Sequence, residues 1–307
     1  MRTCAIVNPV AGGGKVRRIW PRLLSRLLEA TESLSVRWTT DHGTATTLAR
    51  RAVDEGFERI VAVGGDGTLH EVVNGFFEKQ SPIAPSTVLA FVACGSGSDF
   101  RRTLGVPTGV EAVRQLQSDR IQPLDVLCVQ YTTECGRPAQ RYAINIASIG
   151  LSGTVVRRFS RSPLPIPPRL RYLQAALRAL ATDRPVPVHL TLDGESLPIT
   201  RARLVAAANG HTFAAGLPIA PTATPYDGLL DVTVLHDVPI RSLLRHVHRF
   251  YLGTHTSLDG VSTNRGRRLT IDTPDNDRPI WAEADGEALG SLPITVEIVP
   301  QALRMQY

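Results

Sequence analysis

The chain has 307 residues, of which 43% are hydrophobic and 20% are charged, and its formal net charge is +6. This composition allows two domains with sizeable cores and excludes a chain that is disordered over most of its length. The longest apolar stretches, such as residues 204–208, fall far short of the ~20 residues of a transmembrane helix, and Met1 leads almost directly into the first predicted strand. We therefore expect neither a membrane span nor a signal peptide.

The first hundred residues repeat one unit, in which a short apolar strand is followed by a glycine-rich loop and then by a helical stretch. Strands are expected at residues 4–7, 59–63 and 88–92, and the loops that follow cover residues 8–15, 64–68 and 95–100. Strands that alternate with helices predict a parallel sheet covered on both faces. The carboxyl ends of parallel strands lie at one edge of the sheet, so the three loops should lie together there. This is the edge at which such sheets bind ligands.

The middle loop, Gly64-Gly65-Asp66-Gly67-Thr68, is the most informative. Thr68 and Glu71 have the spacing of a capping box, which predicts a helix that begins at Thr68. A glycine turn before a helix start presents backbone N–H groups to a phosphate, and Asp66 would repel that phosphate unless Mg²⁺ lay between them. The alternative is a tight turn whose glycines satisfy backbone geometry alone. Lys15, in the first loop, adds a charge suited to phosphate.

The four cysteines, Cys4, Cys94, Cys128 and Cys135, form no CxxC pair. They predict reduced thiols in a cytosolic protein and no disulfide framework or metal site. Cys94 precedes the third loop, where a buried inert thiol is favoured over a reactive one.

From residue 124 onward the pattern changes to a succession of strands. They are expected near residues 124–130, 142–147, 188–192, 204–208, 229–235, 268–272, 280–284 and 294–299, with helices only at 171–181 and 240–252. Short strands separated by turn residues predict a mostly antiparallel β-sandwich. We expect an α/β nucleotide-binding domain over residues 1–123, to which residues 300–307 return, and a β-sandwich domain over residues 124–299.

Five blocks, in order, resemble the diacylglycerol kinase catalytic-domain family, which includes sphingosine, ceramide and small bacterial lipid kinases. They cover residues 8–15, 64–75, 95–100, 225–232 and 284–287, within a resemblance that runs from about Thr3 to about Pro300. The second block alone is shared with NAD kinases and phosphofructokinases, whereas the ordered set is specific. The resemblance implies an ATP-binding domain, a lipid-acceptor domain and an active site in the cleft between them.

The resemblance also implies roles for individual residues. Glu287 would be the general base for the lipid hydroxyl, with Asp285 close by and Asp66 as a further catalytic residue. Asp66 and Asp125 would be linked to the nucleotide Mg²⁺, and a second Mg²⁺ would be held by Thr224, Asp227 and Leu229. Nucleotide contacts would come from Asn8, Lys15, Thr39, Gly64, Gly65, Asp66, Gly67, Thr68, Glu71, Gly95, Ser96 and Asp99.

Three of these assignments have structural alternatives. Asp-Gly between apolar runs is also a hairpin turn, and Asp193-Gly194-Glu195 repeats the letters of the Glu287 block. The order of the blocks favours the later copy as catalytic and the earlier one as a plain hairpin. Asp125 could instead accept a hydrogen bond at a hinge, and Asp227 could hold a turn without metal.

The chain departs from the family pattern at two positions in the proposed nucleotide site. Ser98 replaces an asparagine, which removes the donor and acceptor of an amide, and His70 replaces another asparagine. Nucleotide preference or catalytic efficiency could change with them. A nucleotide-binding regulator that has lost catalysis is therefore one alternative.

A basic segment follows in the second half. Arg157, Arg158, Arg161, Arg169 and Arg171 surround the apolar, proline-rich residues 163–168 without an acidic residue. This arrangement suits peripheral contact with an anionic membrane surface, and a solvated basic loop is the alternative. Few aromatic residues accompany the arginines, so nucleic acid is disfavoured.

The leading hypothesis is a cytoplasmic kinase that works peripherally at the inner face of a membrane and uses ATP and Mg²⁺ to phosphorylate a lipid hydroxyl. A kinase of a soluble acceptor, similar to NAD kinase, is the main enzymatic alternative. The sequence does not distinguish diacylglycerol, phosphatidylglycerol, a sphingoid base or ceramide as the acceptor, and it leaves the oligomeric state open, a homodimer included.

Overall fold

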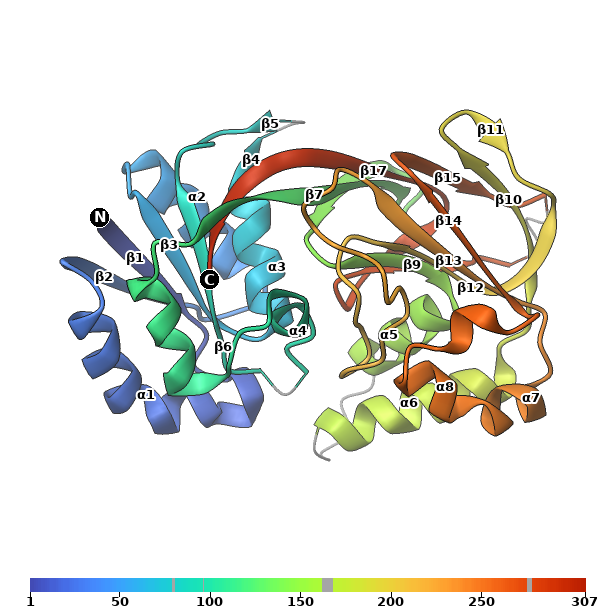
Figure 1. Ribbon diagram of the computed structural model, residues 1–307, viewed down its shortest axis with the longest axis horizontal. Coiled ribbons are helices and arrows are strands. Elements are labelled where there is room, and N and C mark those ends of the chain that lie inside the picture. Colours follow the sequence, from blue (N-terminus) through green and yellow to red (C-terminus); the bar gives the residue numbers. More distant parts are fainter. Residues whose placement is uncertain (79–80, 96, 162–167, 275–277) are drawn as a thin grey trace. The chain divides into compact units, whose positions relative to one another are not determined.

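The computed structural model describes residues 1–78, 81–95, 97–161, 168–274 and 278–307 (Figure 1). The chain divides into two compact units, unit 1 with Met1–Val126 and Pro300–Tyr307, and unit 2 with Leu127–Val299. The sequence places this boundary at residue 123/124, slightly before the observed one. The strands β7 (Ile121–Thr132) and β17 (Glu287–Gln306) each contribute residues to both units.

Unit 1 is built on parallel strands in the order β2-β1-β3-β6. Their bounds are β1 (Arg2–Val7), β2 (Ser33–Trp38), β3 (Arg59–Gly64) and β6 (Val88–Ala93). The end of β17 returns to this sheet, where residues 304–306 pair in parallel with β6. Every residue of β3 and β6 is buried, as expected for central strands covered on both faces.

The helices of unit 1 are α1 (Ala11–Glu29), α2 (Thr44–Asp54), α3 (Asp66–Gly75), the short α4 (Phe100–Leu104) and the 3₁₀ helix η1 (Gly109–Gln117). Leu23 and Leu27 of α1 and Leu116 of η1 pack on the face of the sheet that carries Val7 and Val61. A two-stranded hairpin of β4 (Phe77–Glu78) and β5 (Ser81–Pro82) follows α3. The strand-loop-helix order therefore brings the three glycine loops to the carboxyl ends of β1, β3 and β6.

The predicted start of α3 at Thr68 is wrong, because the helix begins at Asp66 after the extended N-cap residue Gly65 (φ −98°, ψ −172°). Thr68 and Glu71 do not form a capping box. Thr68 accepts a hydrogen bond from Asn8 and Glu71 accepts bonds from residues of α2, so both side chains point to other segments. The capping-box spacing is a local pattern. It fails here because the side chains of Thr68 and Glu71 bond to residues that are distant in sequence.

Unit 2 consists of antiparallel strands. They are β8 (Pro138–Ala143), β9 (Ile146–Gly150), β10 (Val186–Leu192), β11 (Glu195–Ser196), β12 (Thr200–Ala208), β13 (Leu230–His236), β14 (Val261–Gly266), β15 (Arg268–Asp272) and β16 (Trp281–Ala284). Alternate residues of these strands and of β17 form one apolar core that includes Val188, Val205, Val232 and Ile294. The period of two places this core on a single face of each strand.

Helices in unit 2 are α5 (Leu151–Arg161), α6 (Pro168–Thr182), α7 (Ile240–Arg245), α8 (Val247–Tyr251) and the 3₁₀ helix η2 (His255–Ser257). The sequence predicts no helix over residues 151–161, and α5 is the main element that it misses. The segment is rich in Gly, Ser, Thr and Val, which are weak helix formers, so burial of Ser152, Val155 and Val156 stabilises the helix instead. The predicted helix over residues 240–252 is divided at His246.

Candidate active site

Two strand ends of unit 1 are tied together by Asn8. Its backbone N–H donates to the Val63 carbonyl (3.0 Å), and its side-chain amide donates to the Thr68 hydroxyl (3.0 Å). The Cys94 and Gly95 N–H groups both donate to the Gly64 carbonyl, at 2.6 and 3.1 Å. The loops that follow β1, β3 and β6 are thus brought together at one edge of the sheet.

The glycines at this edge are required by close approach. A Cβ on Gly64 would lie 2.3 Å from the Thr68 hydroxyl oxygen, and one on Gly95 would lie 2.6 Å from the Gly65 Cα. A Cβ on Gly12 would lie 2.5 Å from the Cys94 carbonyl oxygen. Side chains at these positions would push the loops apart.

The loop after β1 makes a left-handed turn at the start of α1, with φ of 62°, 68° and 81° at Gly12, Gly13 and Gly14. Only glycine adopts this region at three successive positions without strain. Lys15, which follows, is exposed. Burial raises the pKa of the Cys94 thiol to about 11, so Cys94 is a protonated thiol at neutral pH, as the sequence favours.

Asp66 holds the third loop. Its Oδ2 accepts from the Asp99 N–H (2.9 Å), and its Oδ1 accepts from the Phe100 N–H (3.3 Å) at the start of α4. A Cβ on Gly97 would lie 3.5 Å from Asp66 Oδ2 and 3.8 Å from Asp99 Oδ2, so the two carboxylates border one space that glycine leaves open. Asp99 also accepts from the Arg102 guanidinium (2.8 Å), so an arginine balances its charge, whereas Asp66 accepts from backbone N–H groups. The Asp66 carboxylate therefore suits Mg²⁺, which usually takes its remaining ligands from water and phosphate.

The predicted metal role of Asp125 has less support. Asp125 is 1% exposed, and its Oδ1 accepts from the Gln301 N–H (2.7 Å) where the chain re-enters unit 1. A hydrogen-bond acceptor is the alternative that the sequence leaves open for Asp125, and its link to Mg²⁺ stays a prediction. Among the described residues, no three His, Cys, Asp or Glu side chains gather into a group that could hold a metal by themselves.

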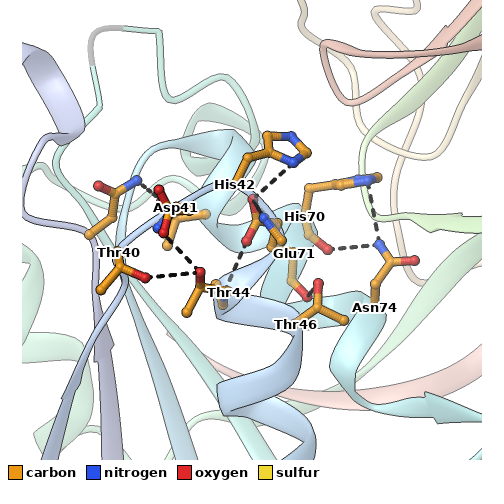
Figure 2. A network of polar contacts seen from close by, with 12 residues as sticks. Thr40, Asp41, His42, Thr44, Thr46, His70, Glu71 and Asn74 are labelled. Atoms are coloured by element: carbon orange, nitrogen blue, oxygen red, sulfur yellow. Dashed lines mark hydrogen bonds and ion pairs between the residues drawn. The ribbon is translucent and has the colours of Figure 1, made fainter.

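Glu71 connects α3 to the loop before α2 (Figure 2). Its two carboxylate oxygens accept from the Gly43 N–H (2.8 Å) and the Ala45 N–H (3.0 Å), and its side chain lies 3.9 Å from the His42 imidazole. A carboxylate at the N-terminus of α2 satisfies free N–H groups and stabilises the helix dipole. In this structure Glu71 fixes residues 42–45, and a direct nucleotide contact stays a prediction.

The remaining predicted nucleotide residues lie on the same set of loops. The Thr39 N–H donates to the Val7 carbonyl (2.9 Å), which places Thr39 beside the end of β1. Ser98 is buried, and its hydroxyl has no hydrogen-bond partner among the described residues. His70 is also buried and lies 3.4 Å from the Asn74 amide (Figure 2). Ser96 lies outside the described residues.

In unit 2, the Asp285-Gly286 pair forms the turn between β16 and β17, with φ of 51° and 83°. The Asp285 carboxylate accepts from the N–H groups of Ile144 (2.8 Å), Asn145 (3.0 Å) and Ile146 (3.1 Å). Three such bonds anchor the turn to the start of β9. Glu287 begins β17 directly after the turn and is half-buried.

Glu283 is a buried carboxylate beside this turn that the sequence analysis misses. It is 3% exposed, and its side chain accepts from the Gly286 N–H (2.9 Å) and from the Ser148 hydroxyl, which lies 2.7 Å from that of Ser152. Burial raises the pKa of Glu283 to about 7, against the hydrogen bonds of Ser148 and Gly286, which lower it. Glu283 is the one charged residue of β16, and a charged residue in an otherwise apolar strand indicates a buried polar contact.

Asn145 is a second residue that sequence reasoning misses. It is 6% exposed, its amide donates to the Thr212 carbonyl (2.8 Å), and its Oδ1 has no partner among the described residues. Because Asn145 also binds Asp285 through its backbone, this polar oxygen lies close to the turn. An asparagine between apolar strand residues, in the segment Tyr142 to Ile149, could have identified it.

The earlier copy of the three letters is a hairpin, as predicted. Asp193 and Gly194 form the turn between β10 and β11, and Glu195 is exposed. The Asp193 carboxylate accepts from the N–H groups of Arg267 (2.9 Å) and Arg268 (2.8 Å), much as Asp285 binds residues 144–146. Backbone geometry alone therefore does not distinguish the copies. The copies differ in exposure, because Glu287 is half-buried and Glu195 is exposed, and the catalytic role of Glu287 stays a prediction.

The region of the second predicted Mg²⁺ is occupied by a cationic side chain. The Arg265 guanidinium binds the carboxylate of Asp227 and donates to Asp231 (3.2 Å), and Asp227 also accepts from the Leu229 N–H (3.1 Å). In this structure Arg265 is the cationic partner of both carboxylates. A Mg²⁺ at Thr224, Asp227 and Leu229 stays a prediction, and we derive no function from it.

Comparison with known proteins agrees with this architecture. The sequence profile described as the diacylglycerol kinase catalytic domain matches residues 2–129, and the profile described as the YegS C-terminal NAD kinase beta sandwich-like domain matches residues 145–307. A diacylglycerol kinase of Mycobacterium tuberculosis (strain ATCC 25618 / H37Rv) is 28% identical over 306 residues, which cover 99% of this chain and 94% of that protein.

Solved structures extend the comparison. A putative diacylglycerol kinase from Bacillus anthracis str. Sterne superposes with a TM-score of 0.78 at 25% identity, covering 100% of this chain and 96% of that one. An NAD kinase from Archaeoglobus fulgidus in complex with ATP gives a TM-score of 0.52 at 17% identity, covering 99% and 93%, and shares the fold alone. The chain therefore belongs to the family of diacylglycerol kinases and YegS-like lipid kinases.

Proposed function

We propose that this protein transfers the γ-phosphate of ATP to the hydroxyl group of a diacylglycerol-like or sphingoid lipid. The observation that carries the proposal is the junction of the three strand-end loops in unit 1, where Asp66 binds the start of α4 and Gly65 packs against Gly95. A glycine-lined junction at the carboxyl ends of parallel strands, with the Asp66 carboxylate beside it, suits a nucleotide phosphate with its cation.

Each part of the site has a role in this reaction. Asp66 would hold Mg²⁺, which, when bound, neutralises phosphate charge as the phosphoryl group is transferred, while Asp99 pairs with Arg102. Lys15 and the left-handed turn at Gly12–Gly14 would orient the phosphates. Glu287 is our proposed general base, and Asp285 and Glu283 fix the turn from which it projects, because both bind backbone N–H groups there.

Two alternatives have specific motivations. A kinase of a soluble acceptor would be consistent with the fold shared with NAD kinases, although the relatives of high coverage are named diacylglycerol kinases. A nucleotide-binding regulator without catalysis is motivated by Ser98 and His70, which replace the amides usual in the family. The soluble-acceptor kinase differs from the lipid kinase in the molecule that receives the phosphate. The regulator differs in that it transfers no phosphate.

Labelled ATP separates the three hypotheses. The purified protein is incubated with Mg²⁺ and with detergent micelles that contain diacylglycerol, phosphatidylglycerol, sphingosine or ceramide, and in parallel with NAD. We expect label in one lipid product and none in NADP. Label in NADP alone would favour the soluble acceptor, and measurable ATP binding without label in any product would favour the regulator.

A further inference from the structure

Glu283 belongs to a closed polar cluster between β9, β16 and α5. One oxygen of its carboxylate accepts from the Ser148 hydroxyl, which lies 2.7 Å from the Ser152 hydroxyl in the first turn of α5. The other oxygen accepts from the Gly286 N–H (2.9 Å). Glu283, Ser148 and Ser152 are 3%, 1% and 7% exposed. We call these three side chains the Glu283 cluster.

A strand pairing and a glycine build this cluster. Glu283 of β16 lies opposite Ser148 of β9 in antiparallel register, so their side chains share one face of the sheet. Helix α5 covers that face closely, because a Cβ on Gly153 would collide with the Trp281 carbonyl oxygen. Ser152, the residue before Gly153, is thereby brought against Ser148. The carboxylate is therefore enclosed by two strands and a helix.

The side chain of Glu287 points away from the Glu283 cluster. In the hairpin of β16 and β17, Glu283 pairs with Ala288, and Ala284 pairs with Glu287. Successive residues of a strand point to opposite faces, so Glu287 shares the face of Ala284 and Glu283 lies on the other face. An effect of Glu283 on the reaction therefore has to pass through the backbone of the turn.

A single hydrogen bond makes this connection. Glu283 accepts from the N–H of Gly286, the residue directly before Glu287. Asp285 and Gly286 both have left-handed backbone, with φ of 51° and 83°. A residue other than glycine keeps such a conformation where surrounding contacts hold it. Asp285 holds one side of the turn through residues 144–146, and Glu283 holds the other side through Gly286.

Burial and hydrogen bonds act in opposite directions on the protonation of Glu283. Burial raises the pKa of its carboxyl to about 7, whereas the hydrogen bonds from Ser148 and Gly286 lower it. A carboxylate accepts these bonds with the help of its charge, which makes them stronger than bonds to the neutral acid. Loss of the proton therefore tightens the bond that holds Gly286.

The charged groups around Glu283 lie on the turn and on α5. Asp285 and Glu287 are acidic, and repulsion from them also raises the pKa of Glu283. β9 and the first turn of α5 bring no charged residue to the cluster, and β12 places an alanine in the same row. Arg157, the first basic residue of α5, stacks on the Trp281 ring (3.4 Å). The acidic turn thus opposes ionisation, and the two hydrogen bonds favour it.

We propose that Glu283 is a positioning residue of the lipid kinase reaction, which holds the Gly286 peptide so that Glu287 meets the acceptor hydroxyl, and that Ser148, backed by Ser152, stabilises its ionised form. This inference rests on the proposed function and deepens it, because it assigns a second carboxylate to the same turn. Glu287 takes the proton of the lipid hydroxyl as the hydroxyl oxygen bonds to the γ-phosphorus and ADP leaves. Glu283 exchanges no proton with the substrate.

Helix α5 also carries part of the basic segment from which the sequence predicts contact with an anionic membrane surface. That contact stays a prediction, and residues 163–167 within the segment lie outside the described residues. No helix in the described part of the chain is long and apolar enough to cross a bilayer. The role of Glu283 depends only on the buried side of α5.

The pH dependence of turnover tests the positioning role. Wild-type kcat on micelles that contain diacylglycerol, phosphatidylglycerol, sphingosine or ceramide should rise as pH increases through about 7, where Glu283 loses its proton. Glu283→Gln stays neutral, so its kcat above this range should be about tenfold to hundredfold below that of the wild type, with the KM for ATP unchanged. Substrate ionisation affects both proteins equally, so the difference between their profiles reports Glu283.

Ser148→Ala separates positioning from a merely structural role. It removes a bond that favours the ionised form, so the midpoint of the rise should move up by about one pH unit while the plateau is largely kept. Ser152→Ala should move it in the same direction by less, and it serves if Ser148→Ala does not fold. Ser160→Ala is the control, because Ser160 of the same helix donates to the Val156 carbonyl (3.0 Å) outside the cluster.

Two further results keep this inference apart from the proposed function. Carbon-13 spectra of protein with labelled glutamate carboxyls should show one titration near pH 7 that is absent in Glu283→Gln. If lipid is phosphorylated but the wild type and Glu283→Gln give parallel pH profiles, the positioning role is wrong and the proposed function stands. If no lipid is phosphorylated although the titration near pH 7 is observed, both are wrong. Thermal midpoints show which variants are folded at the assay temperature.

Discussion

Several carboxylates of this protein accept hydrogen bonds from backbone N–H groups of other segments. Asp66 binds N–H groups at the start of α4, and Asp285 binds those at the start of β9. Asp193 binds two N–H groups at the start of β15 in the same manner. Each carboxylate accepts charge-assisted hydrogen bonds, which are stronger than bonds between neutral groups. A substitution of such a carboxylate can lower turnover, stability or both, so each prediction has to separate the two effects.

Asp66→Asn should show both effects. Loss of the charge should lower turnover by about 10²–10³-fold if Asp66 acts at the transferring phosphate. The amide NH₂ group would also face the Asp99 or Phe100 N–H, so the thermal midpoint should fall slightly. Turnover, ATP affinity and thermal midpoint should be measured together. A folded variant with near-wild-type turnover would remove Asp66 from the site.

Glu287→Gln tests the proposed base. It keeps size and polarity but cannot accept the proton, so we expect turnover to fall about 10²–10⁴-fold with ATP binding nearly unchanged. Glu195→Gln is the matched control in the exposed hairpin and should change stability by no more than about 0.5 kcal/mol. Lipid phosphorylation by both variants decides the question, and a larger loss at Glu195 would reverse the assignment.

Glu283→Gln should change how stability depends on pH. The pKa of Glu283 is raised from 4.5 to about 7 in the folded protein, so the folded state binds the proton more tightly than the unfolded state. The stabilisation from this proton is complete below pH ~4.5 and is lost as pH rises to about 7, a change of about 3 kcal/mol.

Glutamine is neutral throughout this range. Urea denaturation at pH 5 and at pH 7.5 should therefore show that the wild type loses more stability than Glu283→Gln as pH rises. Parallel pH profiles for the two proteins would mean that Glu283 keeps an ordinary pKa.

At the scale of elements, the candidate nucleotide site depends on the contact between α3 and the start of α2. Glu71 of α3 binds the N-terminal N–H groups of α2, and Gly75 lets the two helices approach, because a Cβ there would lie 2.5 Å from the Ala49 Cβ. The loop with Thr39 immediately precedes this helix start. The contact between α2 and α3 therefore fixes a loop that the proposed nucleotide would meet.

Glu71→Gln should weaken this helix start. One oxygen of the carboxylate becomes an NH₂ group that cannot accept from Gly43 or Ala45, so the free energy of unfolding should fall by about 1–2 kcal/mol. Glu29→Gln is the control, because Glu29 is half-exposed at the end of α1 and, within the described part of the chain, its side chain bonds to Ser25 and Arg26 of the same helix. Equal urea midpoints for the two variants would show that Glu71 does not stabilise α2.

At the scale of the whole molecule, the last residues complete unit 1. Residues 304–306 pair with β6, and Gln306 is 3% exposed. Its Oε1 accepts from the buried Arg59 guanidinium (3.0 Å), and its amide donates to the Ser118 carbonyl (2.7 Å). The far end of the chain thus satisfies buried polar groups beside the sheet that carries the candidate nucleotide loops.

Gln306→Leu should destabilise unit 1. The substitution leaves Arg59 without one acceptor and Ser118 without one donor, which should cost about 1–3 kcal/mol. Gln117→Leu, on an exposed face of η1, should have little effect. ATP affinity and thermal unfolding should both report the difference. If Gln306→Leu is as stable as the control, the returning strand is not needed for unit 1.

The sequence by itself determines the order of elements and the chemistry of the loops. Apolar β-branched runs fix the strands at β1, β3 and β6, and a glycine-rich loop follows each of them in the sequence. The five ordered blocks also identify the family. These features are local or lie in fixed order along the chain, so they can be read without contacts.

Only the tertiary structure decides what the polar side chains of these blocks bind. Glu71 caps a helix that is distant in sequence, Arg265 lies where a second Mg²⁺ is predicted, and Glu283 is buried with a raised pKa beside the turn. Helix α5 also forms because its apolar side chains pack against other elements, despite weak propensity. Partners far apart in sequence have no local signature, since hydrogen bonds and burial depend on which segments folding brings together.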